Sequence, residues 1–137
     1  MRAHEVLAAA EAIRAFVATR DARVADLPIT AIGWATVEAD RAFQELGGGA
    51  WRPIDRDARL GARVWRRDPP AGRSVALLVL EPDTEGRVAA FLARFGEGVA
   101  VAYLGAAEPD VGAAASARLV AGGPTWGPFA IVLEARP

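Results

Sequence analysis

Two polar side chains that could take part in catalysis stand in otherwise apolar segments. Tyr103 is the only tyrosine of the chain, and Glu134 directly follows three apolar residues. A glutamate that faces a protein interior has a raised pKa because it loses hydration, and it can then act as a general base. A buried tyrosine hydroxyl needs a hydrogen-bonding partner and can orient a ligand. Simple core packing of Tyr103, and an edge-strand position for Glu134, are the alternatives.

A tryptophan is the third candidate. Trp126 lies between Gly123 and Pro128, in a segment whose glycines and prolines are typical of a loop. Tryptophan is a common anchor for ligands because its large ring can stack against them. Trp126 could equally fill a gap in the core.

The composition excludes several classes of catalytic site. All 16 basic residues are arginine, and the chain has neither lysine nor cysteine. Schiff-base lysines, P-loop lysines, thiolate nucleophiles and cysteine metal sites are therefore excluded. His4 is the only histidine and lies almost at the start of the chain, so a Ser-His-Asp arrangement is not expected.

Charge and hydropathy set expectations for partners and location. The formal net charge is −1, which provides no electrostatic footprint for nucleic acid. No apolar run approaches the ~18 residues of a membrane span. Glu5 and Glu11 do not suit a signal peptide, and the absence of cysteine is compatible with a reducing compartment. We therefore expect a cytoplasmic protein with no nucleic-acid and no membrane partner.

The 137 residues suit a single domain of short helices and strands. Apolar residues recur at helical spacing from Val6 to Val17 and predict an amphipathic helix over 3–19. Apolar runs separated by glycine and proline predict the remaining elements. The predicted strands cover 29–37, 51–54, 60–67, 74–80, 99–104 and 129–135, and the predicted helices 40–46, 85–95 and 111–120.

The segment 85–103 predicts a short helix, a Gly-Glu-Gly hinge and an apolar strand. Its Phe91-Leu92 followed by Gly96-Glu97-Gly98 resembles the junction between the two halves of methylmalonyl-CoA epimerases. These enzymes are members of the vicinal-oxygen-chelate (VOC, glyoxalase/bleomycin-resistance) superfamily. The resemblance implies an α+β fold that consists of tandem βαβββ modules.

The implied modules are unequal. The first would cover residues 29–81 and the second residues 99–137, so that the second is shortened and has lost at least one strand. Residues 1–28 form an extra N-terminal helix and linker. We expect this helix to cover what the shortened module exposes.

The same resemblance implies positions for metal ligands. In metal-binding members, strands of both modules direct His, Gln or Glu side chains to the concave face. The matching positions here are Ala31, Leu78, Val101 and Glu134. One carboxylate cannot hold a divalent ion, because zinc needs ~4 donors and hard cations need ~6 oxygens. We therefore expect no metal and no cofactor.

The leading hypothesis is a metal-independent VOC-like protein that binds an apolar or aromatic small molecule in a cleft. It is similar in this respect to superfamily members that sequester antibiotics and confer resistance. Alternate residues of a strand face opposite sides, and those expected to bind the ligand are Tyr103, Trp126, Leu78, Val101, Ala31 and Gly33. A homodimer is also expected, since family members usually assemble through their sheets.

Two alternatives belong to other functional classes. One is a cofactor-free isomerase, cyclase or lyase that uses Glu134 or Tyr103 for proton transfer. The other is a non-catalytic scaffold whose cleft is filled by its own side chains. A cavity below the ~300 Å³ typical of ligand sites would favour the scaffold.

Overall fold

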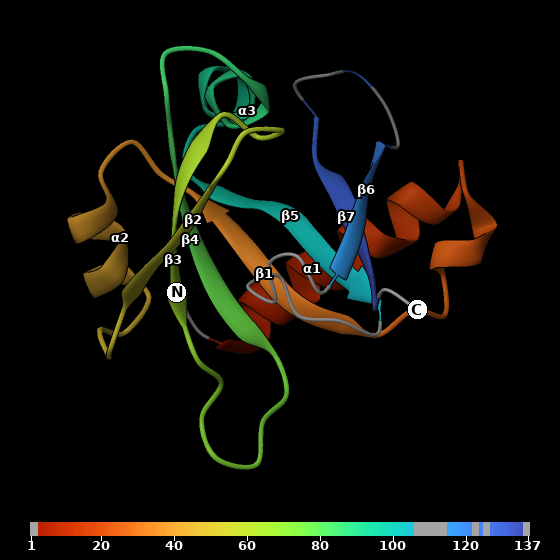
Figure 1. Cartoon of the computed structure of the whole chain (residues 1–137), viewed down its shortest axis with the longest axis horizontal. Coiled ribbons are helices and arrows are strands. Elements are labelled where there is room, and N and C mark those ends of the chain that lie inside the picture. Colours follow the sequence, from red (N-terminus) through yellow and green to blue (C-terminus); the bar gives the residue numbers. More distant parts are fainter. Residues whose placement is uncertain (1–2, 106–114, 122–123, 125–126, 136–137) are drawn as a thin grey trace.

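The computed structural model describes residues 3–105, 115–121, 124 and 127–135. In these ranges seven strands form one curled sheet, in the order β2-β3-β4-β1-β5-β7-β6 (Figure 1). The helices are α1 (Ala3–Ala18), the 3-10 helix η1 (Ala22–Val24), α2 (Ala39–Glu45) and α3 (Arg87–Phe95). The strands are β1 (Ile29–Ala35), β2 (Arg52–Asp57), β3 (Ala62–Arg67), β4 (Ala76–Pro82), β5 (Gly98–Gly105), β6 (Ala115–Ala121) and β7 (Phe129–Ala135).

The first module consists of β1, α2, β2, β3 and β4. β1 is parallel to β4, and antiparallel pairs join β4 to β3 and β3 to β2. Gly47, Gly48 and Gly49 all have positive φ, a conformation that glycine adopts without steric cost. They end α2 and turn the chain toward β2. The predicted helix and strands of this module are confirmed, with small shifts at their ends.

The second module consists of β5, β6 and β7 in the described residues. β5 is parallel to β7 and β7 is antiparallel to β6, which repeats the arrangement of β1, β4 and β3. No described strand corresponds to β2. β1 and β5 pair antiparallel and join both modules into one sheet. The tandem fold with a shortened second module is therefore confirmed.

The helix predicted over 111–120 is wrong where the structure describes that segment. Ala115–Ala121 is strand β6, and all 7 of its residues pair with β7. Alanine-rich sequence has a high intrinsic helix propensity. Pairing with β7 provides a full ladder of backbone hydrogen bonds, and this tertiary context outweighs the local preference. Residues 106–114 lie outside the described residues.

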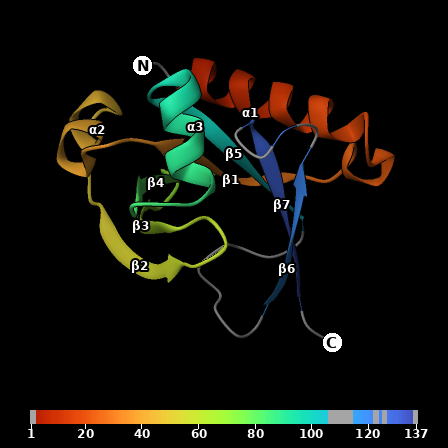
Figure 2. The same cartoon turned by 90° about the horizontal axis from the view of Figure 1, so that it is seen from above.

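α1 covers the convex face of the sheet over β1, β5 and β7 (Figure 2). The buried residues of α1 are Val6, Ala10, Ile13 and Val17, as their spacing predicts. They belong to one cluster with outward side chains of the strands, among them Ile32, Leu104 and Val132. Ala39 and Ala42 of α2 belong to the same cluster beside β4. Each module thus has a helix on its convex face.

The linker after α1 is tied to the second module. Asp21 accepts hydrogen bonds from the Arg23 guanidinium at 2.9 Å and from Arg118 of β6 at 3.2 Å. These bonds, led by the one from Arg23, lower the pKa of Asp21 to about 2. Solvent screens such exposed pairs, so these interactions orient the linker more than they stabilise the fold.

Strand alternation sends the other side chains to the concave face, which has its own buried cluster. The cluster includes the residues that were predicted to face inward, namely Ala31, Ala35, Leu78, Leu80, Val101 and Tyr103. Ile32 and Trp34 lie in the convex cluster instead, also as predicted. Val88 and Phe91 of α3 pack into the concave cluster.

Glu97 of the Gly-Glu-Gly hinge connects the two modules. Thr36 is buried and directly follows β1, and its hydroxyl donates a hydrogen bond to the Glu97 carboxylate. Arg41 of α2 forms an ion pair with the same carboxylate. Thr36 also accepts a hydrogen bond from the Glu38 N–H at 3.1 Å. The hinge glutamate therefore has a structural role.

Candidate functional site

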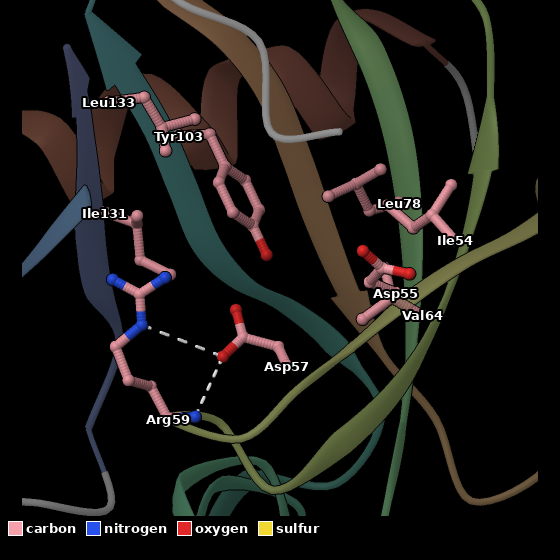
Figure 3. Close-up of a pocket in the computed structure, with 9 residues that line it drawn as sticks. All are labelled: Ile54, Asp55, Asp57, Arg59, Val64, Leu78, Tyr103, Ile131 and Leu133. Atoms are coloured by element: carbon pink, nitrogen blue, oxygen red, sulfur yellow. Dashed lines mark hydrogen bonds and ion pairs between the residues drawn. The ribbon is translucent and has the colours of Figure 1, made fainter. Parts of the chain in front are cut away.

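The concave face contains a cavity of about 40 Å³ (Figure 3). Aliphatic side chains from both modules form its walls, and a polar group of three residues from β2 and the following turn lies at its mouth. The walls are Ile54, Val64, Leu78, Ile131 and Leu133, together with Tyr103. The mouth is formed by Asp55, Asp57 and Arg59.

Tyr103 reaches this cavity because its ring lies over Gly33. A Cβ atom at Gly33 would lie 3.4 Å from Tyr103 Cε1, 3.1 Å from Val101 Cβ and 2.9 Å from Leu80 Cδ1. The last distance is shorter than real Cβ atoms show, so a larger residue at Gly33 would require the Leu80 side chain to shift. The ring is consequently packed, and only 3% of Tyr103 is exposed.

The Tyr103 hydroxyl points toward the Asp57 carboxylate at the cavity mouth (Figure 3). No residue in the described ranges forms a hydrogen bond with it. Burial raises the pKa of Tyr103 above its usual value of 10.0, and the negative charge of Asp57 raises it further. The hydroxyl is therefore neutral at physiological pH. It can donate or accept a hydrogen bond there.

Asp57 is a site residue that the sequence pattern did not reveal. Ile54 pairs with Val64 and Asp57 with Ala62, so β2 has one residue more than β3 over this stretch. This β-bulge brings Ile54 and Asp57 to the same concave face, although their spacing of three predicts opposite faces.

The turn after β2 holds the Asp57 carboxylate in place. Asp57 Oδ1 accepts hydrogen bonds from the backbone N–H groups of Arg59 at 2.9 Å and Leu60 at 3.2 Å. The Arg59 guanidinium Nε lies 3.8 Å from the same oxygen. An aspartate that begins a turn and bonds the backbone two residues later is a recognisable signal. It could have identified the turn, but not the direction of the side chain.

The candidate ligand-binding residues fall into three groups. Leu78 and Tyr103 line the cavity. Ala31 and Val101 are fully buried on the same face, with Gly33 between Leu78 and Val101 in the register of the sheet. Trp126 lies outside the described residues.

Glu134 belongs to β7, where its backbone pairs with Ser116, but its side chain lies outside what the structure describes. Ile131 and Leu133 are the β7 residues that line the cavity. They, and the three residues at the cavity mouth, were not among the candidates predicted from the sequence.

The described ranges offer neither a metal site nor a membrane-spanning helix. These ranges contain no group of three or more His, Cys, Asp or Glu side chains placed to hold a metal ion. Of the four positions matched to metal ligands in the sequence, Ala31, Leu78 and Val101 have aliphatic side chains, and the Glu134 side chain lies outside the described residues. No helix in the described part of the chain is long and apolar enough to cross a membrane.

Comparison with known proteins found no matching family model and no matching curated protein. Solved structures do match. Methylmalonyl-CoA epimerase from Mycobacterium tuberculosis has a TM-score of 0.59 at 16% identity, over 80% of this chain and 88% of that one. A variant of the Streptomyces coelicolor epimerase in complex with 2-nitronate-propionyl-CoA has a TM-score of 0.55 at 18% identity, over 81% and 99%.

A hypothetical protein from Bacillus halodurans C-125 is similar to the same degree, with a TM-score of 0.59 at 15% identity over 82% of this chain and 96% of that one. Identities this low establish the fold alone. The chain therefore has a VOC-like βαβββ fold, which these methylmalonyl-CoA epimerases share.

Proposed function

We propose that this protein binds a small organic molecule at its concave face without a metal ion. One observation carries the proposal: the buried side chain of Tyr103 presents its hydroxyl, with no hydrogen-bonding partner in the described ranges, to a cavity with aliphatic walls and a polar mouth. A ligand atom that forms a hydrogen bond with this hydroxyl would contribute roughly 0.5–1.5 kcal/mol to binding.

The size of the cavity limits how a ligand can enter. Its volume of about 40 Å³ is far below the ~300 Å³ typical of sites that enclose a whole ligand. The ligand therefore inserts a group of a few heavy atoms between Tyr103 and Leu78, and the rest of it lies over Asp57 and Arg59. A methylmalonyl-CoA epimerase of the same fold has been solved with methylmalonyl-CoA, which supports the capacity of this fold for small-molecule ligands.

Independence from metal is the second part of this proposal. Ala31, Leu78 and Val101 occupy the matching ligand positions and are packed in the concave cluster. Their side chains offer no lone pair to a cation.

Nuclear magnetic resonance of the single tyrosine tests the proposal directly. Protein labelled with ¹³C in the tyrosine ring is screened against a fragment library in the presence of EDTA, and Tyr103 provides the only ring signals. We expect fragments that shift these signals saturably, with no change on addition of Mg²⁺ or Zn²⁺ in place of EDTA. Tyr103→Phe, followed by shifts of backbone amides, should weaken binding about three- to tenfold through loss of one hydrogen bond. Binding that EDTA abolishes would contradict metal independence.

A non-catalytic scaffold is the second candidate function, and the small cavity favours it. In that case the concave face is filled by its own side chains and no fragment shifts the Tyr103 signals. The enzymatic alternative uses Glu134 or Tyr103 for proton transfer. Glu134→Gln would then abolish turnover of an identified ligand while preserving its affinity.

We also propose that the protein acts in the cytoplasm as a homodimer. Within the described residues, β6 pairs with β7 alone, which leaves one edge of the strand open. An open edge is a common site of association. Sedimentation velocity should give about twice the monomer mass of 14.4 kDa, and a monomer at micromolar concentration would contradict the dimer.

A further inference from the structure

The charges at the cavity mouth are unbalanced. Asp57 and Arg59 form an ion pair, with Arg59 Nε 3.8 Å from Asp57 Oδ1. Asp55 also lines the cavity, and in the described ranges no basic side chain pairs with it. The neighbouring Arg56 is engaged by Asp83. Among the described residues, the mouth therefore has one negative charge in excess.

The β-bulge in β2 places these carboxylates above the tyrosine. It brings Asp57 to the concave face, and Asp57 Oδ1 is occupied by two backbone N–H groups. The second oxygen of Asp57 is directed toward the Tyr103 hydroxyl (Figure 3). Asp55 approaches the same cavity from the side of Leu78 and Val64.

Three oxygen acceptors thus face a small cavity with aliphatic walls: the Asp55 carboxylate, the free oxygen of Asp57 and the hydroxyl of Tyr103. The hydroxyl is the decisive one, because Tyr103 is only 3% exposed and no described residue bonds it. A primary ammonium has three N–H donors and no acceptor. Its positive charge would also balance the excess negative charge at the mouth.

We propose that the ligand group recognised here is a primary ammonium on a short aliphatic chain, held by Asp55, Asp57 and Tyr103. This inference rests on the proposed binding function and adds the chemical class of the ligand. The chain of the amine packs against Leu78, Ile131 and Leu133. A carboxylate ligand is disfavoured, because it would face Asp55. Arg59, the one cation among the described residues at the mouth, is paired with Asp57.

Three probes of similar size and different charge test this inference. Protein labelled with ¹³C-tyrosine is titrated at pH 7 with n-propylammonium, n-propanol and propionate, and the Tyr103 ring signals are followed. Propylammonium is fully charged at this pH, since amines of this kind have a pKa near ~10.4. We expect a saturable shift with propylammonium and none with the other two probes at equal concentration.

Charge-removing variants locate the site. Asp55→Asn should weaken propylammonium binding about tenfold, through loss of a charge-assisted hydrogen bond. Asp57→Asn should act in the same direction while it keeps an oxygen for the Arg59 and Leu60 N–H groups. Asp26→Asn makes the same charge change at an exposed site in the linker before β1, and should leave the affinity unchanged.

The outcomes separate this inference from the function on which it rests. A shift with propanol or propionate as strong as that with propylammonium would overturn the ammonium inference and leave small-molecule binding intact. The same holds if neither Asp55→Asn nor Asp57→Asn weakens binding. No shift with any probe would overturn the inference and count against ligand binding at this cavity.

Discussion

The first module has its own helix on the convex face, whereas the second receives one from the N-terminus. α2 follows β1 in the chain and packs beside β4, while α1 precedes both modules and covers β1, β5 and β7. In the part that the structure describes, the second module contributes only strands. Burial of apolar surface does not depend on chain order, so any amphipathic helix of the right length can cover an exposed sheet face.

The modules also differ on the concave face. The first contributes Gly33 at the centre of the sheet, and the second contributes the large Tyr103 that lies over it. Small and large residues compensate for each other because protein interiors are packed close to crystal density. The asymmetry of the modules is therefore also what positions the candidate site.

The largest expected effect concerns the two helices. If α1 stabilises the second module as α2 stabilises the first, a charge buried beneath either helix should lower the free energy of unfolding by a similar amount. Ala10→Asp and Ala42→Asp both place a carboxylate at a fully buried position, and each should lower the free energy of unfolding by about 3 kcal/mol or more. Urea denaturation followed by tryptophan fluorescence measures both.

Ala8→Asp is the matched control, since Ala8 is exposed on the same helix. It should cost about 0.5 kcal/mol, through helix propensity alone. A mild effect of Ala10→Asp, similar to that of Ala8→Asp, would show that α1 is dispensable and would break the equivalence of the two helices.

An intermediate effect is expected where the modules meet on the concave face. Gly33→Ala adds a Cβ atom 2.9 Å from Leu80 Cδ1 and 3.4 Å from the Tyr103 ring. It should destabilise the protein by about 1–3 kcal/mol and shift the Tyr103 ring signals. Gly98→Ala in β5 adds the same atom with nothing within 4 Å, and should change stability by less than about 0.5 kcal/mol. Equal results for the two variants would show that Tyr103 does not depend on Gly33.

The smallest expected effect is a pH dependence of the free energy of unfolding that comes from Tyr103 alone. Its pKa is raised above 10.0 in the folded state by burial, so the folded protein keeps a proton that the unfolded chain releases. Stability is therefore fully present below pH 10 and falls as the pH rises above it, by about 1 kcal/mol between pH 10 and 11. No lysine or cysteine titrates in this range, because the chain contains neither.

Denaturation of the wild type and of Tyr103→Phe at several pH values between 9 and 11 measures this effect. The variant should lack the decline. Absorbance at 295 nm provides a second check, since the tyrosine should ionise only on unfolding. Ionisation of the folded protein near pH 10 would show that Tyr103 is open to water.

Much of the candidate site was visible in the sequence. Alternation along the strands predicted that Leu78, Val101 and Tyr103 share a face, and this orientation is confirmed. Their part in ligand binding stays a prediction, as does any role for Trp126 and Glu134. Asp57 was not among the candidates, because a bulge changes the alternation and only pairing between two strands reveals a bulge.

The sequence by itself determined the elements whose periodicity is local and strong. The helical spacing of α1 and the apolar runs of β1 and β7 identify these elements without reference to any partner. The composition likewise determined which chemistries are absent, since a chain without lysine, cysteine or a second histidine cannot supply them.

Only the tertiary structure decided the rest. Ala115–Ala121 became a strand because β7 offered a complete pairing partner, and α1 took the convex face of strands that are far from it in the chain. The cavity exists because Asp57, Leu78 and Tyr103 meet there from three different strands. Contacts of this kind depend on residues distant in sequence, so no local pattern encodes them.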